Sequence, residues 1–355
     1  MADNQKKTIK VASSKLYNFC LQCFREIGVS EDDAQILSDT LMQANLRGVD
    51  SHGIARLPRY IERAQRGLID YQKEINIESK NLCISTINAK NNFGQLVAYH
   101  GMKEAIRKAN QKETGVGLVG ISHTNHIGMA AYYAMIALKE GMIGIVMSNS
   151  PSAVAPWGGA QAILGTNPMA IAIPAGKEYP IVLDMATSLV ARGKIRLALD
   201  NKQEIPLGWA LDEEGNPTTD PQKAIKGALL PFGGPKGYAL SLIIHIFSTI
   251  LSNSARETDI KSLDDFSGNS EIGNFLCAIK IDSFIPQDIF NNEMDELIKR
   301  IKTSKLARGT NRIYLPGEIE FEEQKKREKE GIPLSITLYD NLETLAVELG
   351  VNFNI

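Results

Sequence analysis

Apolar residues recur at helical spacing through the first 67 residues, in three successive segments that each end at a glycine. The pattern predicts helices over residues 13–28, 30–48 and 57–66. Ser30-Glu31-Asp32-Asp33 resembles a capping box at the start of the second helix, and Pro58 suits the first turn of the third. The amino-terminal part of the chain is therefore expected to be helical.

From about residue 81 the pattern changes to short apolar runs that alternate with helical segments. This alternation is typical of an α/β core. The expected helices cover residues 93–110, 125–140 and 237–251, and the expected strands cover residues 116–122, 142–148, 169–173, 180–183 and 275–281. The helix over 237–251 is nearly all apolar, so we expect it to be buried. After Pro286 helical patterning returns, with a charged, solvated helix over 318–330.

These patterns divide the chain into three parts. A helical part covers residues 1–78, an α/β core covers 79–285, and a second helical part covers 286–355. A chain of 355 residues can bury a large core and usually forms two or three structural units.

Composition narrows the class of partner and the compartment. A net charge of −2 gives no electrostatic reason to expect nucleic acid or an anionic membrane as a partner. The first residues are polar, unlike a secretory signal, and the longest apolar stretch, Tyr238 to Phe247, is too short to span a bilayer. Four cysteines do not make a disulfide framework, and Cys20 and Cys23 fit as small core residues of a helix. We expect a cytoplasmic protein with a small-molecule partner.

An irregular stretch rich in glycine and proline runs from Gly158 to Pro168, and a strand-like run shortly after it ends in Asp184-Met185-Ala186-Thr187-Ser188. Glycine lets backbone approach another group closely, and proline stiffens the surrounding segment. The stretch is consistent with backbone folded around a bound molecule, and equally with turns between short strands.

The connection between the second and third predicted helices carries His52 and Arg56. The guanidinium of Arg can hold a carboxylate through two hydrogen bonds, and His can exchange a proton near neutral pH. Reduction of a 2-oxo acid, or oxidation of a 2-hydroxy acid, requires those two groups.

A literal G-x-G-x-x-G motif occurs at Gly115 to Gly120, but its context is wrong for a Rossmann fingerprint. That fingerprint follows a strand and opens a helix, so that a diphosphate meets the helix amino terminus. Here a predicted helix precedes the glycines, which run into a predicted strand. We therefore expect this segment not to contact a cofactor phosphate.

His123 and His126 lie three residues apart at the predicted junction of a strand and a helix. Zinc would require three or four ligands, and no third ligand is apparent nearby. A catalytic or cofactor-contacting histidine is the favoured interpretation, with a structural role as the alternative. Gly233-Gly234-Pro235-Lys236-Gly237 opens the apolar helix and could stabilise a phosphate, or simply start the helix.

Several of these motifs occur together in the order seen in one family. They are Ser51-His52-Gly53 with Arg56, His123-x-x-His126, Gly165-Thr166-Asn167-Pro168, Asp184-Met185-Ala186-Thr187, Pro235-Lys236-Gly237 and Leu315-Pro316-Gly317-Glu318. The chain thus resembles the type 2 malate/L-lactate dehydrogenase family, which includes ureidoglycolate dehydrogenase, sulfolactate dehydrogenase and diketogulonate reductase. The resemblance covers about residues 10 to 335, whereas residues 254–271 match none of its motifs.

The resemblance implies a non-Rossmann α/β core that binds NAD or NADP, a helical domain built from both chain ends, and a homodimer. It implies catalytic roles for His52, His126 and Arg56, of which Arg56 binds the substrate carboxylate. It implies cofactor contacts at Ser150, Asp184, Met185, Ala186, Lys236, Gly237, Pro316, Gly317 and Glu318.

The expected activity is NAD(P)-dependent interconversion of a small 2-hydroxy acid and its 2-oxo acid, with malate/oxaloacetate first and lactate/pyruvate second. His52 or His126 would exchange the proton, with His52 slightly favoured, and no metal would be needed. The alternatives are an imine or ureido-acid dehydrogenase of the same family, a metal-dependent hydrolase that uses His123 and His126, and a catalytically idle scaffold that binds a dinucleotide.

Overall fold

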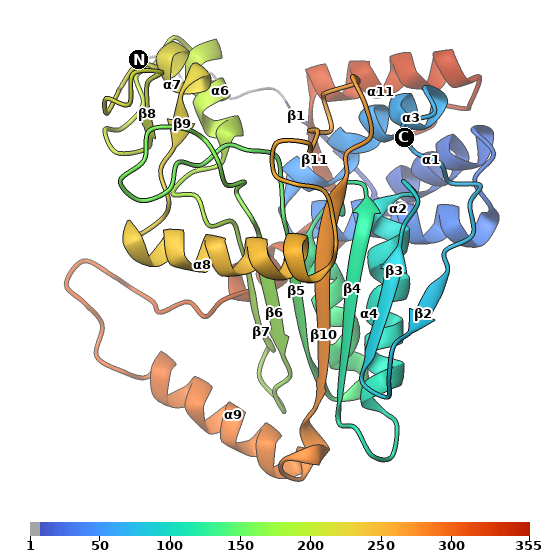
Figure 1. Ribbon diagram of the computed structural model, residues 1–355, viewed down its shortest axis with the longest axis vertical. Helices are drawn as coiled ribbons and strands as arrows, with labels where there is room; N and C mark the ends of the chain where they lie inside the picture. The colour runs from blue at the N-terminus through green and yellow to red at the C-terminus, as the bar shows by residue number, and fades with distance from the viewer. Residues whose placement is uncertain (1–7) are drawn as a thin grey trace.

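A mixed seven-stranded sheet forms the centre of the computed structural model, which describes residues 8–355 (Figure 1). In spatial order its strands are β2 (Ile77–Ser79), β3 (Ile84–Asn88), β4 (Val116–Thr124), β10 (Ile272–Lys280), β5 (Met142–Ser148), β6 (Met169–Ile173) and β7 (Ile181–Met185). Strands β3 and β4 pair in parallel, and each of the other neighbouring pairs is antiparallel. A doubly wound sheet is mainly parallel, so the expected non-Rossmann α/β core is confirmed.

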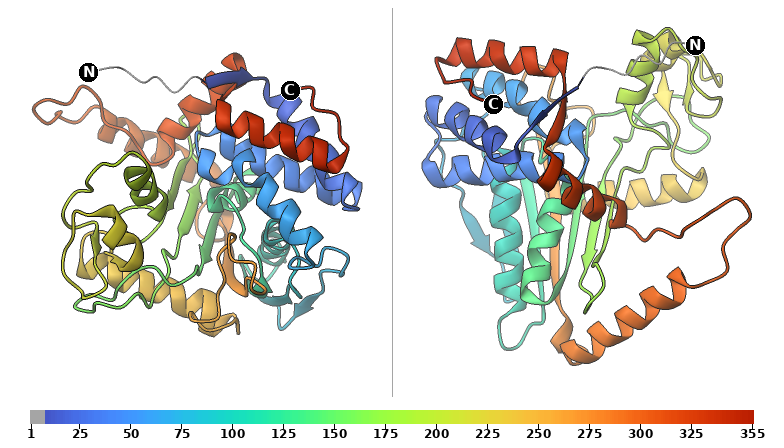
Figure 2. Two further views of the ribbon diagram at one scale, coloured as in Figure 1. Left: turned by 90° about the horizontal axis from the view of Figure 1, so that it is seen from above. Right: turned by 180° about the vertical axis from the view of Figure 1, so that it is seen from behind.

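Helices cover both faces of this sheet (Figures 1 and 2). One face packs against α4 (Gly94–Ala109) and α5 (Ala130–Ile136), and the other packs against α8 (Pro235–His245) and the π-helical η4 (Ile246–Leu251). The central strand β10 is therefore buried over residues 272–278. Because neither face of this strand meets water, its residues do not alternate between apolar and polar, and its sequence is nearly continuously apolar.

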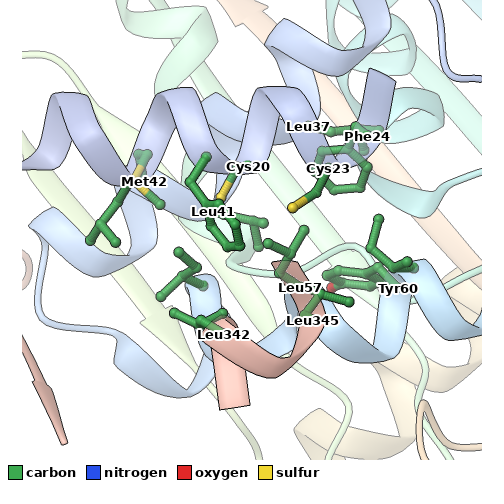
Figure 3. Close-up of a cluster of buried hydrophobic side chains, with 14 of the residues drawn as sticks. Cys20, Cys23, Phe24, Leu37, Leu41, Met42, Leu57, Tyr60, Leu342 and Leu345 are labelled. Atoms are coloured by element: carbon green, nitrogen blue, oxygen red, sulfur yellow. The ribbon is translucent and has the colours of Figure 1, made fainter. Parts of the chain in front are cut away.

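Both ends of the chain contribute to one helical unit (Figure 2). Its elements are α1 (Ser13–Glu26), α2 (Glu31–Leu46), α3 (Leu57–Gln65), β11 (Ile332–Ser335) and α11 (Ile336–Leu349), and β1 (Thr8–Val11) pairs antiparallel with β11. Leu41 and Leu57 meet Leu342 in its core, where Cys20 and Cys23 are buried as free thiols (Figure 3). The expected core positions of these cysteines are confirmed.

The intervening carboxy-terminal segment follows a different path. Helix α9 (Gln287–Lys302) lies at the end of the sheet opposite α11, and an extended stretch then leads back to α10 (Glu318–Glu330) behind the sheet (Figures 1 and 2). The Asp295 carboxylate on α9 accepts hydrogen bonds from the backbone N–H groups of Gly176, Lys177 and Glu178. These bonds attach α9 to the turn between β6 and β7.

A small lobe between β5 and α8 has its own apolar cluster, which includes Val154, Ile195 and Leu229. Its elements are α6 (Arg192–Asp200), β8 (Ala210–Leu211), α7 (Pro221–Lys226) and β9 (Ala228–Leu229). The remaining short 3₁₀ turns are η1 (Asp50–His52), η2 (Ile54–Arg56), η3 (Ala137–Glu140) and η5 (Ile281–Ser283).

Two expectations about helices were wrong. The helix expected from residue 125 begins at Ala130, because Gly128 has a φ of 74° and Met129 is extended, so His126 lies in a loop. The apolar helix over 237–251 is only partly buried: Ile244 is buried, whereas Ile250 and Leu251 are 69% and 62% exposed. An apolar pattern indicates that a surface avoids water, but it does not say whether the same chain covers that surface.

The glycines at Gly115 to Gly120 serve strand packing. They lead into β4 directly after α4, as expected for a segment that is not a Rossmann turn. A Cβ at Gly117 would lie 1.9 Å from the carbonyl oxygen of Ala105 on α4. Glycine at this position therefore lets the helix and the strand approach closely.

Candidate active site

A cleft of about 740 Å³ lies where the helical unit, one end of the sheet and the small lobe meet. Nine of the residues expected to form the site line it: His52, Arg56, His126, Ser150, Asp184, Met185, Ala186, Pro316 and Gly317. The glycine-rich stretch contributes Thr166, and the following Pro168 also lines the wall. Most of the residues that the sequence indicated therefore line one continuous cleft.

Three expected residues do not line this cleft. Lys236 is exposed in the first turn of α8, and a Cβ at Gly237 would lie 1.9 Å from the carbonyl oxygen of Phe232. Glu318 is 3% exposed and forms ion pairs with Lys302 at 2.6 Å and Arg312 at 2.5 Å. Its carboxylate thus stabilises the extended segment before α10, and the neighbouring Pro316 and Gly317 face the cleft instead.

The turns η1 and η2, which carry His52 and Arg56, are attached to α2 through Asn45. The Asn45 amide nitrogen donates to Asp50 at 2.6 Å, and its oxygen accepts from the Ile54 N–H at 2.7 Å. A Cβ at Gly53 would lie 2.2 Å from that amide oxygen, so the turn requires glycine there. Arg327 on α10 forms two further hydrogen bonds to the Asp50 carboxylate, at 2.6 and 3.0 Å. The loop is therefore held rigidly from two helices.

The fold brings His52 and His126 together across 74 residues of sequence. Their rings are stacked with centroids 5.5 Å apart and an interplanar angle of 17°. Arg56 lies on the same loop as His52, and its Nε donates to the Ser51 carbonyl oxygen at 2.7 Å. That bond fixes the guanidinium at the cleft wall, where its remaining N–H groups can bind a carboxylate.

Hydrogen bonds distinguish the two imidazoles. Nδ1 of His126 accepts from the Gly128 backbone N–H at 3.2 Å and lies 2.7 Å from the Tyr60 hydroxyl. Because a backbone N–H can only donate, Nδ1 carries no proton, and neutral His126 has its hydrogen on Nε2. Nδ1 of His52 lies 2.9 Å from the Ser51 hydroxyl, which can accept a hydrogen bond from it. With that tautomer, Nε2 of His52 offers a lone pair.

Both imidazoles are held neutral. Burial, and to a lesser degree the Arg56 charge, lowers the pKa of His52 to about 4. Burial lowers the pKa of His126 well below its ordinary value, with additional contributions from His52 and Arg56. The sequence alone suggested titration near neutrality, whereas the enclosed cleft shifts it toward acid pH. A neutral imidazole is a competent proton acceptor at pH 7.

Further along the cleft lies Asp184 at the end of β7, where the charges of Arg47 and Glu320 act on its carboxyl group. The Asp184 side chain is open to the cleft, and one of its oxygens accepts from the Ala131 N–H at 2.9 Å. Desolvation by the surrounding walls raises its pKa to about 6, opposed by the Ala131 hydrogen bond and the charge of Arg47.

His123 faces away from this cleft. It lines a separate polar pocket of about 370 Å³, where its Nδ1 contacts Glu271. Within residues 8–355 no group of three or more His, Cys, Asp and Glu side chains has an arrangement that could hold a metal ion. The metal-hydrolase alternative required His123 and His126 to meet, and the structure directs them to different pockets.

Sequence reasoning missed several residues of the cleft wall, among them Arg47, Glu320, Arg192, Lys261 and Asp264. The last two belong to the unmatched segment 254–271, which α3 holds in place. Arg63 donates to the carbonyl oxygens of Asp265 and Gly268 at 2.5 and 2.9 Å, and Arg59 pairs with Asp264 at 3.0 Å. Arginines at i and i+4 on α3 were a usable signal, but their partners are about 200 residues away.

Comparison with known proteins gives consistent relatives over nearly the whole chain. The family model described as malate/L-lactate dehydrogenase matches residues 11–343. A malate/(S)-sulfolactate dehydrogenase of Methanothermus fervidus is 44% identical, over 93% of this chain and 95% of its own. An NAD(+) ureidoglycolate dehydrogenase of Escherichia coli is 33% identical, over 94% and 95%. An NADP(+) (2R)-3-sulfolactate dehydrogenase of Chromohalobacter salexigens is 32% identical, over 90% and 93%.

Solved structures agree with this result. The sulfolactate dehydrogenase of Methanocaldococcus jannaschii superposes with a TM-score of 0.91 at 40% identity, and the match covers 97% of this chain and 98% of that one. A malate dehydrogenase of Entamoeba histolytica superposes with a TM-score of 0.92 at 31% identity, over 98% and 100% of the two chains.

Proposed function

The chain belongs to the malate/L-lactate dehydrogenase family, and we propose that it interconverts a small 2-hydroxy acid and its 2-oxo acid with NAD or NADP. The observation that carries this proposal is the convergence of His52, His126 and Arg56 in one cleft that continues to Asp184 and Gly317. Two neutral imidazoles beside a free guanidinium suit a substrate with a hydroxyl group next to a carboxylate.

The cofactor fits the remainder of the cleft. Its walls include Ser150, Met185, Ala186 and Gly317 at the start of α10, and the Nε and Nη1 atoms of the buried Arg47 have no hydrogen-bond partner. When bound, a nicotinamide ring accepts or donates the hydride of the reaction. We assign the contacts to Ser150, Asp184, Met185, Ala186, Pro316 and Gly317, as expected from the sequence.

The protein's own groups bind the acid and move the proton. Arg56 binds the substrate carboxylate, which holds the 2-position beside the stacked imidazoles. In the oxidation direction Nε2 of His52 accepts the hydroxyl proton, while the Nε2–H of His126 donates a hydrogen bond to the same oxygen. This division of roles takes the His52 tautomer in which Nδ1 donates to the Ser51 hydroxyl, and it keeps His52 as the favoured proton carrier.

Malate is the substrate we favour. A cleft that contains Lys261 and Arg192 besides Arg56 has cationic groups for a second acidic group. Lactate has one acidic group, whereas malate and sulfolactate have two, and relatives named for both of the latter are found. The test is a panel of malate, sulfolactate, lactate and ureidoglycolate with NAD and with NADP, followed by nicotinamide absorbance. A higher kcat/KM for malate than for the other three acids supports malate as the substrate, a higher value for another acid contradicts it, and no turnover of any 2-hydroxy acid contradicts the proposed activity.

We also propose a homodimer in the cytoplasm. Between Tyr238 and Leu251 the chain has no Lys, Arg, Asp or Glu, yet Leu242, Ile243, Ile250 and Leu251 are exposed. A second copy of the same apolar face would cover it symmetrically. The four free cysteines fit a reducing compartment, and in the part of the chain described no helix is long and apolar enough to cross a membrane.

Sedimentation of an Ile250→Glu/Leu251→Glu double variant tests the dimer. The wild type should sediment as a dimer and this variant as a monomer, while Val347→Glu, which changes an even more exposed apolar residue on α11, should not alter the mass. A monomeric wild type would disprove the assembly.

A further inference from the structure

Arg47 combines deep burial with a position in the cleft wall. It caps the carboxyl end of α2, its side chain is 3% exposed, and it belongs to the residues that line the cleft. Its Nε and Nη1 atoms are shielded from solvent and have no hydrogen-bond partner. Its guanidinium lies 4.2 Å from the centroid of the Phe321 ring, so the group is held in one place by stacking.

A buried cation without a partner is costly, so its retention requires a reason. The carboxylates of Glu320 and Asp184 exert a favourable field on Arg47, although burial is the larger effect and lowers its pKa from the ordinary value. Neither carboxylate forms an ion pair with Arg47 within 4.0 Å in the described structure. Two carboxylates therefore lie near Arg47, but neither of them hydrogen-bonds to its guanidinium, whose Nε and Nη1 N–H groups are left without an acceptor.

The amino terminus of α10 lies directly beside this guanidinium. Phe321, on which Arg47 stacks, is in the first turn of α10, and Gly317 precedes the helix with a φ of 86° and no side-chain cap. Gly317, Ile319 and Glu320 all line the cleft. The backbone N–H groups of Ile319 and Glu320 belong to the first turn, so they have no acceptor within the helix. A helix amino terminus with an unpaired arginine is a favourable environment for a phosphate.

We infer that Arg47, together with the first turn of α10, binds the diphosphate of the dinucleotide. This inference rests on the proposed function, because it assigns a binding residue for the cofactor of the same reaction. Arg47 is not one of the positions that the sequence motifs indicated.

Two other anions fit less well. The substrate carboxylate belongs beside the histidines, where Arg56 is already placed on the same loop as His52. The 2′-phosphate of NADP would concentrate about two negative charges on a single phosphate beside Asp184 and Glu320. Those carboxylates suit ribose hydroxyl groups instead, which donate hydrogen bonds to an acidic residue in other dinucleotide sites. A diphosphate, with about one charge per phosphate, is the anion that the site favours.

The experiment measures binding rather than turnover. Arg47→Met removes the charge and keeps an apolar side chain over Phe321, Arg47→Lys keeps the charge, and Arg25→Met is a control at an exposed arginine. Dissociation constants are measured for NADH, NADPH, ADP-ribose and adenosine by fluorescence and calorimetry. A melting curve of each variant checks that it is folded.

We expect Arg47→Met to weaken NADH, NADPH and ADP-ribose by the same factor of about 10 to 100, the range for one hydrogen bond to a charged group. Adenosine binding should not change, and Arg47→Lys should lie between the wild type and Arg47→Met. Unchanged affinity for ADP-ribose, or weakening confined to NADPH, would overturn the assignment. If the wild type binds none of the dinucleotides, the proposed function itself fails, which is a separate outcome. If Arg47→Met does not fold, the affinities of Arg47→Lys and the wild type for ADP-ribose are compared instead, and equal affinities would overturn the assignment.

Discussion

The imidazole rings of His52 and His126 lie stacked, 5.5 Å apart, although one belongs to a turn after α2 and the other to the loop after β4. Each ring uses Nδ1 for a contact with the protein, so each can offer Nε2 to the cleft. Burial disfavours protonation of both rings, with smaller contributions from Arg56 for both and from His52 for His126. This arrangement leads to specific expectations for the reaction.

Substituting each histidine by Gln should separate proton transfer from hydrogen bonding. Loss of the proton carrier should lower kcat by about 10²- to 10⁴-fold. We expect that loss in His52→Gln, and a smaller loss in kcat with a higher KM in His126→Gln, because neutral His126 presents a donor. A larger kcat defect in His126→Gln would reverse the assignment, and wild-type kcat in both variants would remove both residues from the chemistry.

The pH dependence should reflect the lowered pKa of His52. Oxidation requires the neutral imidazole, so kcat/KM for the hydroxy acid should be flat down to about pH 5 and fall as the pH drops through about 4. Reduction requires the protonated form, so its kcat/KM should decline as the pH rises above that value. An inflection near pH 6.5 that disappears in His52→Gln would show that the cleft does not desolvate this ring.

Arg56→Lys should weaken substrate binding selectively. A lysine cannot form the paired hydrogen bonds of a guanidinium with a carboxylate, and losing such a charge pair costs about 2–5 kcal/mol. We expect a large increase in KM for the oxo acid with an unchanged dissociation constant for NADH. Unaltered steady-state kinetics would place Arg56 outside the substrate site.

Tyr60→Phe tests the positioning of His126. The variant keeps the buried ring but removes the hydroxyl that lies 2.7 Å from Nδ1. We expect a loss of about 1 kcal/mol in the free energy of unfolding and a severalfold decrease in kcat. The absent donor should also raise the pKa of His126, because the hydroxyl stabilises the neutral ring. Tyr99→Phe is the matched control, and equal effects of the two substitutions on kcat would argue against a positioning role.

The ionised carboxylate of Asp184 should lower the stability of the ligand-free protein at pH values above the pKa of Asp184. Its folded-state pKa of about 6 exceeds the value of 3.8 for a free carboxyl, so the folded state binds the proton more tightly. Stability is therefore lost as the pH rises from about 4 to about 6. Asp184→Asn should raise Tm at pH 7.5 and leave it nearly unchanged at pH 4. A lower Tm of the variant at both pH values would contradict this interpretation.

Gly117→Ala tests the non-Rossmann interpretation of the glycine motif. The added methyl group would overlap the Ala105 carbonyl oxygen, so we expect a loss of about 1–3 kcal/mol or more in the free energy of unfolding. The affinity for NADH should not change once the protein is folded. Gly268→Ala, which adds a methyl group in open space, is the control for denaturant unfolding. A selective loss of cofactor affinity would instead place a phosphate on this segment.

Local sequence determined many of the helices and strands and a set of residues that line the cleft. Helical spacing identified α1, α2 and α3, and apolar runs identified β4, β5 and β6, because these patterns depend on neighbouring residues. The motifs around His52, Asp184 and Gly317 also identified cleft residues, since the order of short segments along the chain is visible in the sequence. The start of α5 was misjudged because Gly128 breaks the helical pattern over only a few residues.

The tertiary structure alone decided which residues distant in sequence contact one another. Stacking of His52 on His126, contact of Arg47 with the first turn of α10, and placement of residues 261–264 by α3 all join segments distant in sequence. Periodicity carries no information about such pairs, because it records only which face of an element avoids water. The pKa values of His52 and Asp184 depend on desolvation by walls drawn from several elements. The sequence therefore determined the residues available for the chemistry, and the path of the chain determined their protonation and their partners.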